Sequence, residues 1–377
     1  MKHIYILIII LLSFGYASCS GADKSDSIKN GENCCTKKEP KSLIPVNDLV
    51  LIYDGGAHRT ATWDTNHFAP YVSYTDIDKK EHWLFDGFLF LEIVDGKGKI
   101  FATGYNGMPS TQKEWKDLLQ HYFTSGNGIY ALNDCVKETK QRIGKFTEKR
   151  KVVIGIPEPI VPMKNNNYNL PNDYWGKVNG KQLDFSINAD RVAACKWYID
   201  YAIQCFDEAK FENIELAGFY WIAEETLHTS TILADIASYL NEKMYSFNWI
   251  PYWKTTPDYY NWQSLKFNYA YLQPNYFFNN TIPYSRLNEA CKVAKEYNLD
   301  LELEFDMRVL AEKENWASRL YDYMNAFREN GILKTKKIAY YQDADALYAL
   351  SRSQNAANLQ LYNDFCSFVL EHIEKMK

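Results

Sequence analysis

Residues 214–252 read IELAGFYWIAEETLHTSTILADIASYLNEKMYSFNWIPY, and this stretch decides the fold. Its first part, Ile214–Ala223, is short, aromatic and apolar on both faces, as expected of a β-strand that is covered on both sides. Apolar residues at three- and four-residue spacing then predict a helix over Ser230–Lys243, and a second apolar run, Met244–Tyr252, predicts another strand. A strand, a helix and a strand in this order indicate parallel strands joined by a right-handed crossover.

The same alternation runs along the chain from Asp48 onward. Eight strands are predicted, at Asp48–Gly55, Asp86–Ile93, Val152–Pro157, Ile214–Ala223, Met244–Tyr252, Phe267–Asn275, Leu299–Phe305 and Lys337–Gln342. The clearest helices are predicted at Asp190–Ala209, Ser230–Lys243, Tyr284–Tyr297, Asn315–Asn330 and Asn358–Lys375, and Thr111–Gln141 is predicted to contain two more. Eight repeats without a linker between them favour a closed barrel over an open sheet. We therefore predict an α/β fold, a single (β/α)8 TIM barrel over residues 46–377.

The predicted connections differ in length at the two ends of the strands. Those that enter strands are short, as at residues 211–213, whereas His58–Trp83 and Ile160–Phe185, which leave strands, are long, polar and aromatic. Barrel enzymes elaborate the loops at the C-terminal ends of their strands because that end carries the site. The asymmetry therefore predicts elaborated βα loops around a pocket at that end.

Composition excludes one class of partner and leaves another open. The formal net charge is −5 and no long run of Lys and Arg occurs, so we expect no nucleic-acid partner. Aromatic residues make up 16% of the chain, with 29 Tyr and 10 Trp. This excess fits aromatic packing in a large core and fits a cleft lined with flat rings, as in sugar-binding sites, equally well.

The N-terminus has the pattern of an export signal. A short basic region precedes the apolar run Ile4–Leu12, which is too short to span a membrane, and small residues follow, so residues 1–19 are predicted to be a signal peptide. Tyr16–Cys19 resembles a bacterial lipobox, in which Cys19 is lipidated, and the polar residues 20–45 are predicted to be a flexible tether. We expect an exported lipoprotein of the bacterial cell envelope that meets the membrane only through this lipid. The alternative is ordinary cleavage nearby with Cys19 unmodified.

The Cys and His residues give no metal pattern. The five cysteines of the predicted barrel are scattered and are expected to be buried free thiols: Cys135, Cys195, Cys205, Cys291 and Cys366. The sequence contains neither CxxC nor HExxH. We expect no metal and no other cofactor.

The seventh predicted strand carries three acids in alternation, in the sequence Leu301-Glu302-Leu303-Glu304-Phe305-Asp306. Successive side chains of a strand point to opposite faces, so the apolar residues share one face and the acids share the other. The apolar face must pack against helices, which predicts that Glu302, Glu304 and Asp306 point into the barrel. A structural ion network with Arg and Lys inside the barrel would also explain them, but buried carboxyls are typical of active sites as well.

The fourth predicted strand ends in two adjacent glutamates, Glu224 and Glu225, whose side chains diverge, so at most one of them faces the pocket directly. Both could instead begin a solvated loop or cap the next helix. Acids and residue types that bind carbohydrate also stand at most other strand ends: Asp54, Glu92, Glu158, Trp253, Gln273, Asn275, Tyr341 and Asp343.

Two carboxyls across a pocket are what glycoside hydrolysis requires. One donates a proton to the leaving oxygen, and the other attacks the anomeric carbon or activates water. A pair from strands four and seven resembles the large clan of barrel glycosidases with the acid/base after strand four and the nucleophile after strand seven. That clan usually has Asn directly before the acid/base, whereas Ala223 precedes Glu224 here.

Four stretches together resemble the DUF4855 family of bacterial secreted proteins and lipoproteins. They are residues 218–225 (GFYWIAEE), 249–253 (WIPYW), 272–276 (LQPNY) and 302–306 (ELEFD). The resemblance covers nearly the whole predicted barrel domain. It implies a barrel similar to glycosidases and a carbohydrate ligand, without identifying the substrate.

The leading hypothesis is a glycoside hydrolase that acts on an oligosaccharide or polysaccharide. Glu304 is predicted to be the nucleophile or base, and Glu225 or Glu224 the proton donor. Stacking on sugar rings is predicted for Trp221, Trp253, Tyr276 and Tyr341, and hydrogen bonds to hydroxyls for Asp54, Gln273 and Asn275. Further substrate contacts are predicted for Glu92, Glu158, Glu302, Asp306 and Asp343.

Two other hypotheses use the same residues. A non-catalytic glycan-binding lipoprotein on a barrel scaffold would use the aromatic residues without requiring the carboxylates. A divalent-cation site could be built from Glu302, Glu304 and Asp306, because carboxylate oxygens suit Ca²⁺ and Mg²⁺.

Overall fold

The computed structural model describes residues 43–144, 148–162, 168–253 and 257–377. The predicted signal peptide with Cys19 and the tether up to residue 42 lie outside the described residues. The last three residues of the predicted tether are described, and among them Ile44 packs against the hydrophobic core. Within the described part of the chain, no helix has the length and apolar character needed to cross a membrane.

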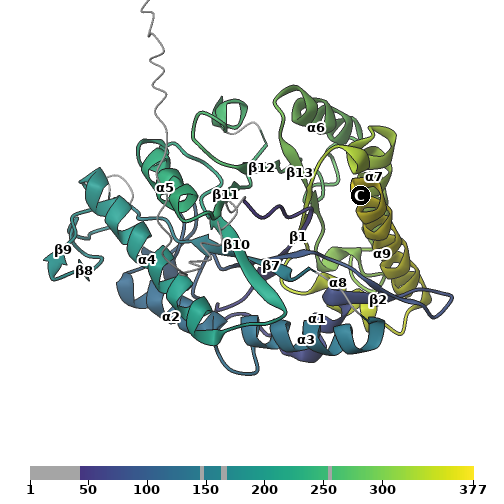
Figure 1. Cartoon of the computed structure of the whole chain (residues 1–377). Coiled ribbons are helices and arrows are strands. Elements are labelled where there is room, and N and C mark those ends of the chain that lie inside the picture. Colours follow the sequence, from purple (N-terminus) through teal and green to yellow (C-terminus); the bar gives the residue numbers. More distant parts are fainter. Residues whose placement is uncertain (1–42, 145–147, 163–167, 254–256) are drawn as a thin grey trace, which may run out of the picture. The chain divides into compact units, whose positions relative to one another are not determined.

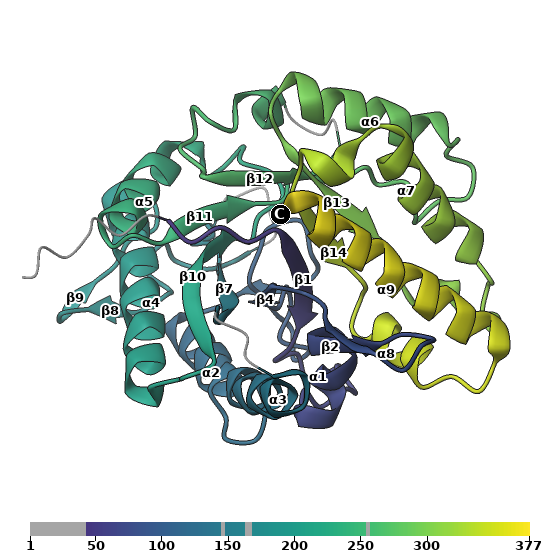
Figure 2. The ribbon, with the colours of Figure 1, turned by 45° about the vertical axis from the view of Figure 1, so that its right-hand side comes forward.

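The eight predicted strands form a closed parallel barrel, which confirms the (β/α)8 fold (Figures 1 and 2). In barrel order they are β1 (Asp48–Tyr53), β4 (Gly87–Leu91), β7 (Arg150–Ile156), β10 (Ile214–Trp221), β11 (Ser246–Trp249), β12 (Tyr269–Leu272), β13 (Asp300–Glu304) and β14 (Ile338–Tyr341). The last strand, β14, pairs with β1 and closes the barrel. Because all eight strands are parallel, their C-terminal ends meet at one end of the barrel.

Helices surround the barrel, as the two views show (Figures 1 and 2). Those expected from the sequence are α2 (Gln112–Tyr122), α3 (Gly128–Ile143), α4 (Asn188–Ala209), α5 (Ser230–Glu242), α6 (Ser285–Glu296), α7 (Ala317–Glu329) and α9 (Ala356–Met376). Two short helices were not predicted, α1 (Thr65–Val72) and α8 (Ala346–Ser351). Short 3-10 helices occupy Pro257–Asn261, Met307–Val309 and Ile332–Lys334.

The connection predicted as one long loop at His58–Trp83 is different. It contains α1 and the hairpin of β2 (Ser73–Thr75) and β3 (Glu81–Trp83). Helix α1 has only eight residues and includes Pro70, so it shows little periodicity in the sequence. Residues of β3 line a cavity together with Asp48, the first residue of β1, so the hairpin lies at the N-terminal end of the barrel rather than the C-terminal end.

Two other insertions do elaborate the C-terminal end. The connection from β4 to α2 contains β5 (Lys99–Ile100) and β6 (Met108–Pro109), and the connection from β7 to α4 contains β8 (Lys177–Val178) and β9 (Lys181–Gln182). The first of them supplies Tyr105 to the pocket described below. The predicted elaboration of βα loops is therefore correct for these connections.

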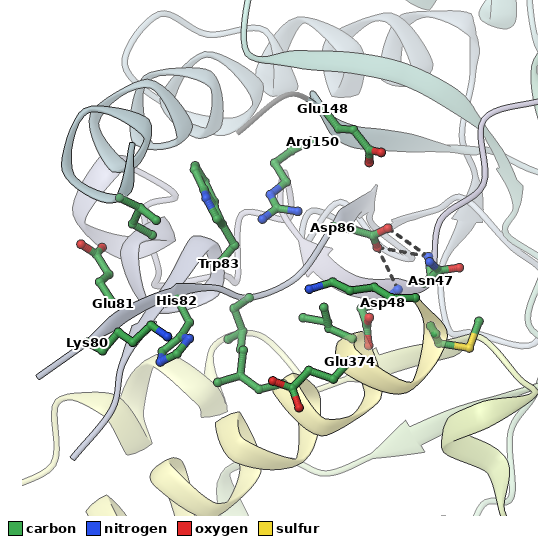
Figure 3. Close-up of a pocket in the computed structure, with 16 residues that line it drawn as sticks. Asn47, Asp48, Lys80, Glu81, His82, Trp83, Asp86, Glu148, Arg150 and Glu374 are labelled. Carbon is green, nitrogen blue, oxygen red and sulfur yellow. Dashed lines mark hydrogen bonds between the residues drawn. The ribbon is translucent and has the colours of Figure 1, made fainter. Parts of the chain in front are cut away.

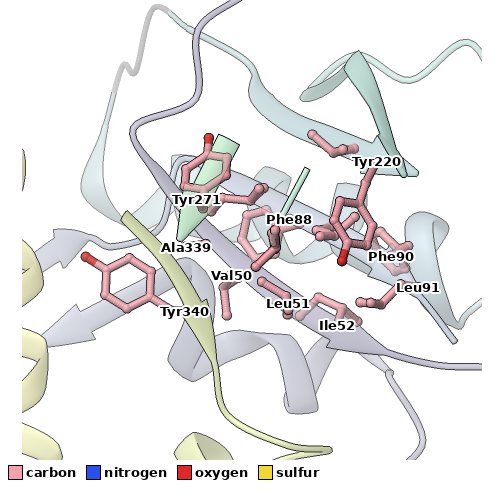
Figure 4. Close-up of a cluster of buried hydrophobic side chains, with 14 of the residues drawn as sticks. Val50, Leu51, Ile52, Phe88, Phe90, Leu91, Tyr220, Tyr271, Ala339 and Tyr340 are labelled. Carbon is pink, nitrogen blue, oxygen red and sulfur yellow. The ribbon is translucent and has the colours of Figure 1, made fainter. Parts of the chain in front are cut away.

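The core is aromatic and aliphatic, and Figure 4 shows part of it, where Val50, Ile52, Phe88 and Phe90 from β1 and β4 pack together. All four side chains are fully buried. Burying one such side chain contributes about 1.5–3 kcal/mol to folding. Part of the high aromatic content is therefore explained by core packing.

Strand β10 approaches β11 closely at Gly218. A Cβ atom at this position would lie 2.0 Å from the Ser246 hydroxyl oxygen and 2.5 Å from the Ser246 carbonyl oxygen. The pairing of β10 with β7 also shifts its register between Leu216 and Gly218. Beyond this shift Tyr220 faces the inside of the barrel, where it lines a cavity, and Trp221 packs 6.2 Å from the Phe247 ring.

Candidate active site

A cavity of about 390 Å³ lies at the C-terminal ends of the barrel strands. It is lined by Leu51, Tyr53, Arg59, Ile93, Val94, Tyr105, Tyr220, Glu224, Ile250, Tyr252, Gln273, Asn275, Phe278, Glu302, Glu304 and Tyr341. The lining combines three carboxyls with five tyrosines, and its members come from strands on all sides of the barrel. This is the end at which barrel enzymes place their sites.

Glu304 is the last residue of β13, and it lines the cavity as the alternation of that strand predicts. Its side chain is buried, and its Oε2 atom accepts a hydrogen bond from the Tyr323 hydroxyl on α7. Its other oxygen, Oε1, has no hydrogen-bond partner among the described residues. One oxygen is therefore held in place and the other is free to react.

Two backbone N–H groups also stabilise the anionic form of Glu304. They belong to Asn275 and Tyr276, directly after β12, and together with the Tyr323 hydroxyl they lower the pKa of the carboxyl. Asn275 has a φ of 50°, a left-handed conformation that Asn adopts more easily than most residues. This backbone turn at Asn275 places its N–H beside the carboxyl of β13.

The pKa values of the three carboxyls in the cavity are all raised. Burial raises the pKa of Glu304 to about 7 despite these hydrogen bonds, and the charge of Glu224 adds to the rise. Burial and repulsion from Glu304 and Glu224 hold the pKa of Glu302 well above its usual range. Burial also raises the pKa of Glu224, and the hydrogen bond from Gln273 opposes this rise. Such perturbed carboxyls in a cleft are typical of catalytic sites.

The choice between the two glutamates after β10 is resolved by their exposure. Glu224 is half-buried and lines the cavity, whereas the Glu225 side chain is exposed to solvent outside the lining. Strands β10 and β13 are separated by β11 and β12 in the barrel, so Glu224 and Glu304 approach the cavity from different sides. The proton-donor prediction is therefore corrected from either residue to Glu224.

Arg59 lines the cavity and was not predicted from the sequence. Its Nε and Nη2 atoms bind both oxygens of Glu92, at 2.8 and 2.9 Å, and its guanidinium lies 4.9 Å from the centre of the Tyr53 ring. The Nη1 atom lies 3.7 Å from a carboxylate oxygen of Asp343. Glu92 and Asp343, both predicted to contact substrate, instead hold Arg59 from outside the cavity lining. No sequence pattern marks an arginine in a loop for this position.

Tyrosines form most of the cavity wall: Tyr53, Tyr105, Tyr220, Tyr252 and Tyr341. Of these only Tyr341 was predicted, and its ring packs edge-on against Tyr53 and Phe278 at 5.7 and 5.6 Å. Tyr105 is largely exposed at the rim, with 42% of its surface accessible. Flat rings with a hydroxyl at one end suit a ligand that has both apolar and polar faces.

Three aromatic residues predicted to stack on sugar rings lie elsewhere. Trp221 is fully buried on the outer side of β10, because the alternation that turns Tyr220 inward turns its neighbour outward. Tyr276 is buried, donates a hydrogen bond to Asp322, and lies under the guanidinium of Arg319 at 3.7 Å. Trp253 is also buried, and Arg286 lies 5.0 Å from its ring centre. These predictions are corrected, since the structure uses all three rings for packing.

Three predicted acids also lie outside the cavity lining. Asp54 is buried and lies 2.6 Å from His121 Nε2. Glu158 is buried and accepts hydrogen bonds from the backbone and hydroxyl of Thr103 at 2.7 and 2.8 Å. Asp306 follows the end of β13, accepts a hydrogen bond from the Arg308 backbone, and forms an ion pair with its guanidinium at 2.6 Å. The expectation of three inward acids on this strand therefore holds for two of them.

The alternatives raised for the β13 acids can be compared with their surroundings. In the described part of the chain, no cation contributes to the pKa of Glu302 or Glu304, so an ion network with Arg or Lys is not what holds them. No group of three or more His, Cys, Asp or Glu side chains is placed to hold a metal ion among the described residues. The hypothesis of a cation site at Asp306 thus has no geometric support.

A second cavity, of about 530 Å³, lies at the opposite end of the barrel (Figure 3). Asp86 accepts backbone hydrogen bonds there from Asn47 and Asp48, at 3.1 and 2.8 Å. Arg150 packs over Trp83, with its guanidinium 4.6 Å from the ring centre. These contacts join the starts of β1, β4 and β7 with the β3 hairpin. Residues at the N-terminal end of a barrel generally serve stability, so we place the candidate site at the other end.

Comparisons with known proteins give a family and two distant structural similarities. The family model DUF4855, described as a domain of unknown function, matches residues 48–367. Among curated proteins, none has a sequence that matches this chain. A mutant tryptophan synthase alpha-subunit from Pyrococcus furiosus has 9% identity and a TM-score of 0.38, with 86% of this chain and 97% of that chain covered. A "putative alpha-L-fucosidase" from Bacteroides thetaiotaomicron has 11% identity and a TM-score of 0.42, with 92% and 99% covered. We draw nothing about function from these two similarities.

Proposed function

The chain belongs to the DUF4855 family, and from the geometry of its pocket we propose that it is a glycoside hydrolase. The observation that carries the proposal is the placement of Glu304 and Glu224. They stand at the ends of β13 and β10, approach one tyrosine-walled cavity from different sides, and have different surroundings. Two carboxyls with separated roles are the requirement for cleaving a glycosidic bond.

Glu304 suits the role of nucleophile or base. Its Oε2 is fixed by Tyr323, and two backbone N–H groups favour its ionised form. Its Oε1 is unpaired within the described structure and is the atom that attacks the anomeric carbon or takes a proton from water. Repulsion from Glu224 keeps the two from both being charged without cost, which favours one proton shared between them.

Glu224 suits the role of proton donor. Burial raises its pKa, so it holds a proton at a pH where an exposed glutamate has lost it. This proton passes to the oxygen of the leaving group as the bond from that oxygen to the anomeric carbon breaks. The nearby Gln273 amide contacts this carboxyl and orients it.

Digestion of a glycan panel, with products identified by mass, tests the proposal. Wild-type protein is expected to shorten at least one glycan, and Glu304→Gln is expected to abolish that product. Calorimetry on the same panel separates hydrolysis from simple binding. If wild type and Glu304→Gln bind a glycan equally and neither yields product, the chain is a glycan-binding protein instead.

We also propose that the chain is an exported lipoprotein of the bacterial envelope. The motivation is the signal-like pattern of residues 1–19, with Cys19 after small residues. Metabolic labelling with a fatty acid is expected to mark the wild-type protein and not Cys19→Ser. Equal labelling of both would contradict lipidation at this cysteine.

A further inference from the structure

The cavity contains more negative charge than glycoside hydrolysis requires. Two carboxyls are sufficient for that reaction, but Glu224, Glu302 and Glu304 all line the cavity. Resting on the hydrolase proposal above, we infer that the sugar bound here carries a free amine, so that the substrate is a glycan with hexosamine residues that are not N-acetylated.

The one cationic side chain among the described lining residues does not offset this charge. Arg59 is paired with both oxygens of Glu92, whose side chain is fully buried, and it faces Asp343 as well. Its positive charge is therefore already compensated by two carboxylates behind the lining. An anionic sugar would find three carboxyls and no free cation, whereas an ammonium group would find uncompensated negative charge.

Glu302 is the residue that a bound amine would satisfy. It lies two residues before Glu304 on the same face of β13, one step deeper in the barrel, and is only 2% exposed. The described residues give its carboxyl no hydrogen bond, because its surroundings act on it through burial and the charges of Glu304 and Glu224. A buried carboxyl without a partner is costly unless a ligand supplies donors. An ammonium group supplies three N–H donors together with the opposite charge.

The wall of the cavity suits the same group. Five tyrosine rings line it, and a cation near the face of an aromatic ring gains about 0.5–2 kcal/mol, with more gained when water is excluded. N-acetylation removes the positive charge and leaves a single N–H donor, so it removes both attractions. The proposed selectivity is therefore for amine over acetamide and over hydroxyl on otherwise matched sugars.

Calorimetry with matched sugars tests the inference on the wild-type protein. The probes are glucosamine, galactosamine and mannosamine, each with its N-acetylated and its neutral parent sugar, at about pH 6, where a sugar amine is protonated. At least one amine is expected to bind about tenfold more tightly than both of its partners, which corresponds to about 1.4 kcal/mol. Preference for an acetylated or neutral sugar in every trio would overturn the inference.

Two charge-neutralising variants locate the effect. Glu302→Gln is expected to reduce the preference for the amine about tenfold. Glu138→Gln, which removes the same charge from an exposed position on α3, is expected to preserve it. Thermal unfolding checks that each variant is folded. An equal preference in both variants and in wild type would show that Glu302 does not recognise the amine, and would overturn the inference.

Digestion of matched oligosaccharides, made of glucosamine, N-acetylglucosamine or glucose units and of the galactose series, separates this inference from the proposed function. Cleavage of only neutral or acetylated members would overturn the inference and leave the hydrolase proposal standing. Selective amine binding without product from any member would retain the inference and contradict hydrolysis. Neither binding nor cleavage would contradict both.

Discussion

Glu304→Gln is expected to remove activity and to make the protein more stable at alkaline pH. Burial raises the pKa of Glu304 from 4.5 to about 7. At about 1.4 kcal/mol per pKa unit, ionising this buried carboxyl costs about 3 kcal/mol. The folded protein binds this proton more tightly than the unfolded chain does. The stability that the proton contributes is therefore complete below about pH 4.5 and is lost as the pH rises through about 7.

Glutamine has nearly the same shape and carries no charge, so the variant escapes this loss. Between pH 4.5 and pH 8, the free energy of unfolding of Glu304→Gln is expected to rise by about 3 kcal/mol relative to wild type. For a domain of this size, that corresponds to a relative gain of about 4 °C in melting temperature.

Urea unfolding followed by circular dichroism at both pH values measures this difference directly. Glu138→Gln, at an exposed site, is the matched control and should show no such change. A stability difference between Glu304→Gln and wild type that is the same at both pH values would refute the reasoning. It would mean that Glu304 ionises without cost and is not buried beside the other carboxyls.

Three further substitutions have directions that follow from the contacts. Tyr323→Phe removes a hydrogen bond that lowers the pKa of Glu304, so the acidic limb of the kcat/KM profile should move to higher pH; an unmoved limb would contradict the role of that hydroxyl. Arg59→Met leaves the charge of Glu92 buried without a partner and should destabilise the fold by about 3–5 kcal/mol in urea unfolding. Adding Glu92→Gln should restore most of this loss, and failure to do so would place the cost elsewhere. Gly218→Ala forces a Cβ against the backbone of β11 and should lower stability by about 3 kcal/mol, whereas a neutral result would show that the strands separate easily.

The barrel could be predicted from the sequence because each strand is an apolar run with a polar end. Strands that are covered on both faces produce this pattern wherever they occur in the barrel. The alternation in residues 301–305 also placed Glu302 and Glu304 inside, since their neighbours are all apolar. Helix α1 was missed because it is eight residues long and contains a proline.

The site could be predicted only where alternation was unambiguous. In β10 the inward residue Tyr220 and the outward residue Trp221 are both large aromatics, so the pattern does not distinguish the two faces. Glu224 and Glu225 follow the end of that strand, where the path of the loop rather than the strand repeat decides which of them enters the cavity. Arg59 reaches the cavity from a connecting segment with no repeat at all.

The most direct test of the account is the rate of glycan cleavage by three single variants on whichever glycan the wild-type protein cuts. Glu304→Gln and Glu224→Gln are each expected to lower kcat by at least about 100-fold, because each removes a group that takes part in bond cleavage. Glu225→Gln, which alters the exposed neighbour, is expected to retain the wild-type rate. Full activity in Glu304→Gln or Glu224→Gln, or a loss confined to Glu225→Gln, would contradict the assignment of this pocket as the catalytic site.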